Sequence, residues 1–339
     1  MYMLVKHLDK YRYTPFVATP GEGELADEIR KLGVNVFALS FPRIRPLNIF
    51  KIIIALTRLV KNIRTYNIDL IHTDAPREAL FAGIAGKLLR VPVICHLRVS
   101  DSNIWLDKIL YRFVDCFIAV SHAVTHRFSD IDNKNKIHVI YNGVELDKFI
   151  VLAVERPASC LKVGYFGRID KRKGIDVLIN AIKLLKKNVE LFIMGDGDDE
   201  HREELERMAE GTRTVFESYK QNILADMSSV DVIVLPSYYG EGLSRVIIES
   251  FALGKVIIVS DLPENLEALG EQFQEFVFPV GVSYKLMEIL KNISANKSIL
   301  DERKDDLRSR AEKYFDIRRN TRQIENVYDR LVTSNSFPL

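Results

Sequence analysis

Short apolar runs rich in Val and Ile alternate with longer stretches of helical periodicity along the whole chain. Short β-branched runs between turn signals predict buried strands, and apolar residues spaced three and four positions apart predict helices. We expect strands near 14–19, 34–39, 68–73, 91–97, 115–121, 137–142, 161–167, 189–195, 213–218, 230–235, 255–261 and 275–279. We expect helices near 22–32, 47–66, 75–90, 104–113, 122–129, 175–187, 243–253 and 318–333.

This alternation of strands and helices predicts parallel sheets with helices on both faces. The chain has 339 residues, more than a single hydrophobic core usually organises, so we expect two doubly wound α/β domains. Turn residues cluster from Asn142 to Pro157, where we place the link between the domains. The predicted domains are 1–145 and 146–317, and a last helix occupies 318–339.

Composition is that of an ordinary globular protein, with 47% apolar and 28% charged residues. No apolar run approaches the roughly 18 residues of a membrane span, and the start of the chain lacks a signal-peptide pattern. The three cysteines, Cys95, Cys116 and Cys160, are widely spaced and indicate neither a disulfide framework nor a zinc site. We therefore expect a cytoplasmic protein.

Charge is spread unevenly along the chain. Residues 1–148 carry 21 Lys and Arg against 15 Asp and Glu, and no acid lies between Ile29 and Ile68. This excess is too mild for a nucleic-acid-binding protein and lacks an aromatic platform, so no nucleic-acid partner is expected. The predicted helix at 47–66 is basic and amphipathic, which suits peripheral contact with an anionic membrane as well as simple coverage of a sheet. Its basic and polar side carries Lys51, Arg58, Lys61, Asn62 and Thr65.

Residues 230–261 form a predicted strand–loop–helix–strand unit. Its loop opens at the carboxyl end of a strand, where open α/β sheets bind ligands, and leads into a helix N-terminus, which favours phosphate. Glu241 lies in this loop and Glu249 inside the following helix. Both carboxylates can therefore face one bound molecule and accept hydrogen bonds from its hydroxyl groups.

A second predicted ligand loop, Gly167–Gly174, follows a strand and opens the helix at 175–187. Arg168 offers a planar fork of donors and Lys173 a point charge, which together suit a diphosphate. The two intervening basic residues, Lys171 and Arg172, are expected to be solvated.

These two segments resemble the retaining glycosyltransferases of family 4, which have the GT-B fold of two Rossmann-like domains. The stretch EGLSRVIIESFALGK is similar to the Glu-x7-Glu signature of that family, and the family's Gly-Arg-x4-Lys-Gly is matched completely from Gly167 to Gly174. The chain departs from the family pattern at Ser244, Ser250 and Val256, where the family carries Gly or Pro, Ala, and Pro. The resemblance covers the chain except for its start, and it implies a last helix that crosses back to the first domain.

The resemblance implies metal-independent, front-face transfer of a sugar from a nucleotide-diphosphate sugar to an acceptor, with retention at the anomeric carbon and no cofactor. In this scheme Arg168 and Lys173 hold the diphosphate and Glu241 orients the donor sugar, so these three residues are the predicted catalytic set. Glu249 binds the ribose hydroxyls, and backbone amides at the start of the helix add the helix dipole. The expected donor-binding residues are Gly167, Tyr219, Gly242, Leu243, Ser244 and Glu249.

In the first domain, His72, His96 and Arg98 end two neighbouring predicted strands, and the family often places a His or an Arg near the second of these positions. We assign these three residues to the acceptor side. Many relatives build cell-surface polysaccharide or lipid-linked sugars, so we expect a saccharide or lipid-linked acceptor, with enzyme activity at the inner face of the membrane.

Two further segments leave alternatives open. Tyr219 can stack on the nucleotide base or pack as a partly buried aromatic residue. Asp196 and Asp198 have the spacing of a metal-binding Asp-x-Asp, but they also fit the family's Gly-x-Gly turn, in which Asp caps the backbone. We expect the turn and no metal.

The start of the chain resembles the family only from the middle of its first helix onward. The family's opening strand and Gly-rich turn have no counterpart here, and Gly21-x-Gly23 is expected to be an ordinary turn. A sheet without this strand has an exposed edge, which places activity in doubt. Two alternatives therefore remain: a non-catalytic subunit that binds sugar nucleotides, and a GT-B epimerase of the UDP-GlcNAc type.

Overall fold

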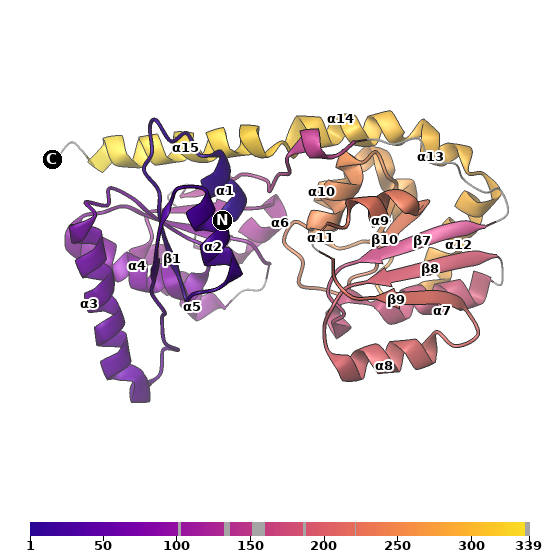
Figure 1. Cartoon of the computed structure of the whole chain (residues 1–339), viewed down its shortest axis with the longest axis horizontal. Helices are drawn as coiled ribbons and strands as arrows, with labels where there is room; N and C mark the ends of the chain where they lie inside the picture. The colour runs from indigo at the N-terminus through magenta and orange to yellow at the C-terminus, as the bar shows by residue number, and fades with distance from the viewer. Residues whose placement is uncertain (101–102, 132–135, 151–159, 186–187, 221, 336–339) are drawn as a thin grey trace. The chain divides into compact units, whose positions relative to one another are not determined.

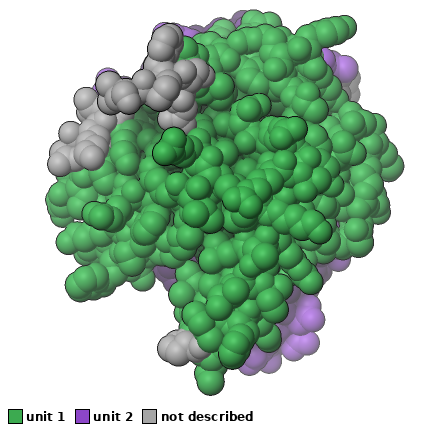
Figure 2. Space-filling view, turned by 90° about the vertical axis from the view of Figure 1, so that its left-hand side faces the viewer, with its two compact units in different colours: residues 1–141, 317–339 green, residues 142–316 purple. Residues whose placement is uncertain are grey.

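The computed structural model describes residues 1–100, 103–131, 136–150, 160–185, 188–220 and 222–335. The chain divides into two compact units (Figure 2): unit 1 comprises Met1–Tyr141 and Ile317–Leu339, and unit 2 comprises Asn142–Asp316. The sequence places these boundaries at 145/146 and 317/318. The predicted link as far as Pro157 and the predicted helix end at 187 lie outside the described residues.

Unit 2 is built on a sheet of six parallel strands in the order β12-β11-β10-β7-β8-β9. The first strand of unit 2, β7, lies in the middle of this sheet, and β8 and β9 follow on one side of it (Figure 1). The last three strands, β10, β11 and β12, lie on the other side of β7. This reversal creates a topological switch point between β7 and β10. The strands are β7 (Leu161–Phe166), β8 (Val189–Met194), β9 (Arg213–Glu217), β10 (Val232–Leu235), β11 (Ile257–Ser260) and β12 (Val277–Phe278).

The helices of unit 2 differ in how much of their surface they bury. Every residue of α10 from Val246 to Ala252 is buried, whereas α8 buries only His201 and Leu205. Helix α7 packs against α8 and α12, and α10 packs against α11 and α14. The helical elements are η3 (Leu146–Lys148), η4 (Lys171–Lys173), α7 (Ile175–Leu185), α8 (Asp199–Met208), α9 (Leu224–Ser229), α10 (Arg245–Ala252), α11 (Pro263–Leu269), η5 (Glu271–Phe276), α12 (Ser283–Ala295), α13 (Ser298–Glu302) and α14 (Lys304–Tyr314).

Unit 1 contains two separate parallel sheets, one of β1 and β2 and one in the order β3-β4-β5-β6. The strands are β1 (Phe16–Thr19), β2 (Asn35–Ala38), β3 (Ile71–Thr73), β4 (Val93–Leu97), β5 (Cys116–Ala119) and β6 (Ile137–Val139). The helical elements are α1 (Tyr2–His7), α2 (Glu24–Lys31), η1 (Pro46–Asn48), α3 (Ile49–Thr65), α4 (Pro76–Leu89), α5 (Ile104–Phe113), α6 (His122–Thr125), η2 (His126–Phe128) and α15 (Ile317–Asn335).

Helices join the two sheets of unit 1. On α1, Val5 packs with Ile29 and Val34, next to the small sheet, and Leu4 packs against Ile94 in β4. Helix α15 contributes Ile324, Val327 and Tyr328 to the same core as Leu4, and Figure 1 shows it beside α1. The last helix of the chain is therefore an integral part of unit 1.

Each strand expected from the sequence contains an observed strand. The α-helices that the sequence analysis does not predict are α1, α8, α9, α11, α12, α13 and α14. Helix α1 has only six residues, and α8 has a narrow apolar side, so neither produces a clear periodic pattern. Within the described residues, no helix has the length and apolarity needed to span a bilayer.

Candidate active site

The two predicted ligand loops of unit 2 leave adjacent strands at the switch point. β7 and β10 are hydrogen-bonded neighbours, with Val232 opposite Val163. Because the strands are parallel, the loop after β7 and the loop after β10 emerge from the same edge of the sheet. The sequence motifs that carry Lys173 and Glu241 are thus brought together by topology.

The loop after β7 packs closely against the residues that follow β10. A Cβ atom on Gly174 would lie 2.1 Å from the carbonyl oxygen of Pro236, and the residue has a φ of +62°, so the position requires glycine. The backbone N–H of Tyr238 donates to the carbonyl of Arg172 at 2.8 Å. Arg172 also binds Asp170 through Nε and Nη2, which holds the pKa of Asp170 well below its usual value. Arg172, which the sequence predicts to be solvated, keeps 37% of its side chain exposed while its guanidinium stabilises the turn.

Lys173 and Glu241 form an ion pair, with 2.5 Å between Nζ and Oε1. Ser237 donates its hydroxyl to the same carboxylate oxygen at 2.6 Å, and its own carbonyl accepts from Ser260 Oγ at 2.6 Å. Glu241 is 6% exposed and Ser237 is fully buried. The carboxylate is therefore held in a fixed position beside a cation.

Arg168 extends from the same loop, and its side chain is 76% exposed. Its Nη2 lies 4.0 Å from Asp170 Oδ2, and its carbonyl accepts from Tyr165 OH at 2.7 Å. The backbone at Arg168 is thus fixed, whereas the guanidinium reaches into solvent, where an anionic group can meet it. Gly167 precedes it directly.

Helix α10 begins after Ser244, its N-cap residue, whose side chain makes no capping bond. Gly242 and Leu243, which lead into this helix, are buried. Glu249, one turn inside, is 7% exposed and accepts from Arg245 Nη2 at 2.8 Å. Burial raises the pKa of Glu249, and the nearby Arg245 opposes this rise.

Two partners of the predicted site residues were missed by the sequence analysis. Arg245 precedes Glu249 by four residues on a helix, and this spacing alone would have predicted the ion pair between them. Ser237 carries no such signal, since only the folded loop brings its hydroxyl to Glu241.

The Gly195–Asp198 segment is a turn that packs on the loop after β7. Asp196 Oδ1 accepts from the backbone N–H of Tyr219 at 3.1 Å, and Asp198 caps α8 by accepting from His201 N at 2.8 Å. Both carboxylates thus accept hydrogen bonds from backbone N–H groups. Tyr219 is 62% exposed, so it is not a buried core residue, and base stacking stays its predicted role.

In unit 1, the three residues assigned to the acceptor side lie together. His72 in β3 and His96 in β4 are hydrogen-bonded, with 3.2 Å between Nε2 and Nδ1, and their rings stack with centroids 5.3 Å apart. Arg98 follows β4 directly and forms an ion pair with Asp74. Burial, reinforced by the charges of Arg98 and the chain's amino group, lowers the pKa of His72 to about 3.

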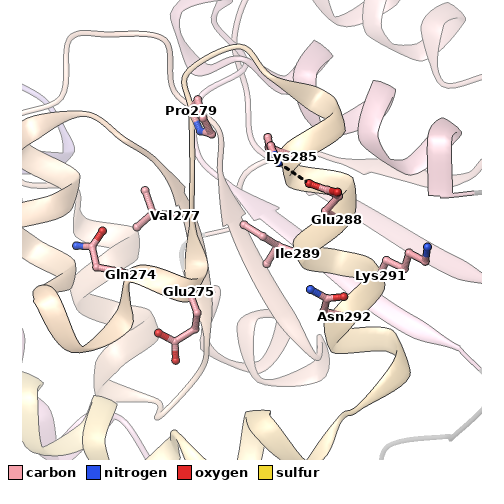
Figure 3. Close-up of a pocket in the computed structure, with 9 residues that line it drawn as sticks. All are labelled: Gln274, Glu275, Val277, Pro279, Lys285, Glu288, Ile289, Lys291 and Asn292. Atoms are coloured by element: carbon pink, nitrogen blue, oxygen red, sulfur yellow. Dashed lines mark hydrogen bonds and ion pairs between the residues drawn. The ribbon is translucent and has the colours of Figure 1, made fainter.

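A hollow of about 450 Å³ lies elsewhere in unit 2, between the segment around β12 and helix α12 (Figure 3). Lys285 and Glu288 form an ion pair of 2.9 Å on its wall. None of the residues that the sequence analysis assigns to donor or acceptor lines this hollow. This hollow is therefore distinct from the predicted site at the switch point.

Solved structures show which fold this chain has. HepE of Anabaena, in complex with UDP and glucose, matches with a TM-score of 0.80 and 20% identity over 96% of this chain and 95% of that chain. Sucrose-phosphate synthase of Thermosynechococcus elongatus matches with a TM-score of 0.77 and 21% identity over 98% and 92%. The architecture is GT-B, which confirms the fold class predicted from the sequence.

Two family models match the chain and together cover most of it. The model described as "Glycosyltransferase Family 4" matches residues 1–148, and the model described as "Glycosyl transferases group 1" matches residues 160–296. The chain is also 26% identical to the N,N'-diacetylbacillosaminyl-diphospho-undecaprenol alpha-1,3-N-acetylgalactosaminyltransferase of Campylobacter jejuni, over 80% of this chain and 79% of that protein. It is 26% identical to the phosphatidyl-myo-inositol mannosyltransferase of Mycobacterium leprae, over 79% and 75%. The chain belongs to glycosyltransferase family 4.

Membership of this family makes the protein a glycosyltransferase, as the sequence analysis predicted. Neither alternative, a non-catalytic subunit or an epimerase, receives support from these relatives. The individual site residues stay predictions, which the experiments below address.

Proposed function

We propose that this glycosyltransferase moves a sugar from a nucleoside-diphosphate sugar to a saccharide or lipid-linked acceptor, with retention at the anomeric carbon and without a metal ion. The bond between the anomeric carbon and the diphosphate breaks, and a bond to the acceptor oxygen forms on the same face. The proton of the acceptor hydroxyl leaves with the diphosphate.

The Lys173–Glu241 ion pair at the switch point carries this proposal. A diphosphate that reaches the loop competes with Glu241 for the ammonium group, and Lys173 then stabilises the charge that develops as the glycosidic bond breaks. Glu241 stays in place because Ser237 holds it, and it is then available to accept hydrogen bonds from sugar hydroxyls. Arg168 and the amides at the start of α10 add positive potential.

Support for the substrates comes from relatives. HepE binds UDP and glucose, which favours a nucleotide sugar as donor. The names of the Campylobacter and Mycobacterium relatives include a diphospho-undecaprenol and a phosphatidyl-inositol, which favours a lipid-linked acceptor in polysaccharide or glycolipid synthesis.

Donor hydrolysis without acceptor tests the proposal. Incubation of the full chain with UDP-, GDP- and ADP-sugars is expected to release diphosphate from at least one donor, with no loss of rate in EDTA. Glu241→Gln removes the negative charge and is expected to slow this release by at least about tenfold. Glu200→Gln, an exposed carboxylate on α8, is the matched control and should react like wild type. If no donor is hydrolysed, or if Glu241→Gln equals wild type, the proposal is wrong; a requirement for manganese overturns its metal-free part.

We further propose that unit 1 contacts an anionic membrane through η1 and α3. Leu47 and Phe50 are 95% and 78% exposed, and Ile53 and Ile54 are about half exposed. Exposed Lys51 flanks them on a stretch without acidic residues. An apolar edge bordered by cations suits the boundary between lipid headgroups and acyl chains.

Sedimentation with vesicles tests this contact. We expect the chain to pellet at low salt with vesicles that contain anionic lipid and to remain in solution with neutral vesicles. The double variant Leu47→Ser with Phe50→Ser is expected to bind about tenfold more weakly, because two exposed apolar anchors are lost. Leu88→Ser, at another exposed leucine of unit 1, is the control. Equal pelleting of all three proteins would contradict the assignment of this surface.

A further inference from the structure

A chain of hydrogen bonds in unit 1 connects the last helix to His96. The hydroxyl of Tyr328 in α15 lies 2.5 Å from His72 Nδ1, and His72 Nε2 lies 3.2 Å from His96 Nδ1. In the β3–β4 register His72 is opposite Ile94, so His96, two residues further on, projects from the same face of the sheet. Three side chains from two strands and a helix are thus linked in series.

The far end of this chain is unsatisfied. His96 is 4% exposed, and its Nε2 is a buried atom without a hydrogen-bond partner among the described residues. Buried polar atoms are rarely left in this state, and an unpaired one at a functional edge calls for an explanation.

Both histidines are neutral at physiological pH. Burial and the charge of Arg98 lower the pKa of His72 to about 3, and the same causes hold the pKa of His96 well below its usual value. Each ring therefore carries one N–H, and the position of that proton is set by the hydrogen bonds.

The direction of the chain follows from a count of unpaired groups. If Tyr328 donates its O–H to His72 Nδ1, then His72 Nε2–H donates to His96 Nδ1, and His96 must carry its proton on Nε2. In the reverse direction, the Tyr328 hydroxyl proton has no acceptor among the described residues and His96 Nε2 is an unpaired acceptor. The first direction leaves one buried group unpaired and the second leaves two, so the first is favoured.

We propose that Tyr328 and His72 are positioning residues that fix His96 as the Nε2–H tautomer, so that His96 donates a hydrogen bond to an oxygen of the bound saccharide substrate. His96 lies in β4, close to the edge where its carboxyl end opens. Because Nε2 is covered in this structure, the ring edge must become accessible when substrate binds. The hydrogen bond to substrate rests on the proposed glycosyl transfer, whereas the tautomer of His96 does not depend on that proposal.

Nitrogen-15 NMR of the full chain tests the tautomer directly. The chain has seven histidines, which can be labelled selectively and assigned by single substitutions. Long-range proton–nitrogen spectra are expected to show His72 and His96 protonated on Nε2. In Tyr328→Phe the donor to His72 Nδ1 is lost. Each direction then leaves two buried groups unpaired, so His72 and His96 are expected to populate both tautomers.

Activity provides the second readout. With the nucleotide sugar that the hydrolysis assay identifies as donor, Tyr328→Phe is expected to lower kcat/KM by about tenfold, because one hydrogen bond to the substrate is lost. Tyr13→Phe is the matched control, because Tyr13 packs edge-on against Tyr328 and donates to Asp329 on the same helix, but does not contact either histidine. It should leave the tautomers and the activity unchanged.

Two variants of His72 distinguish a loss of positioning from a loss of folding. His72→Gln places an amide donor near the position of Nε2 and is expected to keep His96 in its tautomer and to retain more activity than His72→Leu. Wild-type His96 protonated on Nδ1, or an unchanged spectrum in Tyr328→Phe, overturns the inference. If the tautomers behave as stated but Tyr328→Phe is fully active, the role in substrate binding is wrong. If wild type hydrolyses no donor, the proposed function fails, and the substrate role of His96 fails with it, while the NMR result still decides the tautomer.

Discussion

Lys173→Ala is expected to lower kcat/KM for donor cleavage by about 100- to 1000-fold. The ammonium group of Lys173 lies 2.5 Å from Glu241, the predicted catalytic carboxylate. A positioned charge of this kind, at the place where negative charge develops, contributes about this much in enzymes generally. Initial rates with the preferred nucleotide sugar, at several donor concentrations, measure the effect.

Lys171 supplies the control for this substitution. It lies in the same turn, two residues earlier, and is exposed. Lys171→Ala changes the net charge by the same amount, so it reports how much of the loss comes from long-range potential alone. Equal losses in the two variants would show that Lys173 has no specific role. Retention of partial activity in Lys173→Arg would agree with a contact to phosphate.

Gly195→Ala is expected to disturb the site, although Gly195 itself is not a predicted ligand residue. A Cβ atom at this position would lie 1.8 Å from the carbonyl oxygen of Gly167, so one of the two loops must move. Strain of this kind costs about 1–3 kcal/mol of folding free energy. A shift of about 1 Å in a substrate-binding loop can cost about 100-fold in rate, and the displaced segment carries Arg168. Urea unfolding and donor-cleavage rates measure the two effects.

Gly21→Ala is the control, because nothing lies within 4 Å of a Cβ atom there. We expect it to unfold and react like wild type. If Gly195→Ala is as stable and as active as Gly21→Ala, the close approach of the two loops does not position the site.

The sequence predicts the sheet well because the strands are buried and parallel, and buried parallel strands are apolar along their whole length. Val232–Leu235 and Ile257–Ser260 illustrate this, since every residue in them is buried. Helices are harder to predict where few of their residues are buried, because the apolar pattern is then too weak to show a helical period. The polar helix α8 is the clearest case, because only two of its residues are buried.

The candidate site shows a similar division. The positions of Lys173 and Glu241 at two strand ends predict that they lie near each other, and they form an ion pair. The interactions of Arg172 with Asp170 and of Ser237 with Glu241 depend on how the loops close, which residue spacing does not specify. The contact between Tyr328 and His72 joins residues 256 positions apart, and no local pattern could have indicated it.

The order of segments along the chain has a consequence for biosynthesis. All residues of unit 2, from Asn142 to Asp316, leave the ribosome before α15 does. Unit 1 begins first but cannot complete its core until Ile324, Val327 and Tyr328 arrive. We therefore expect unit 2 to fold on the nascent chain first, whereas Leu4 and its neighbours in unit 1 stay uncovered until α15 has been translated.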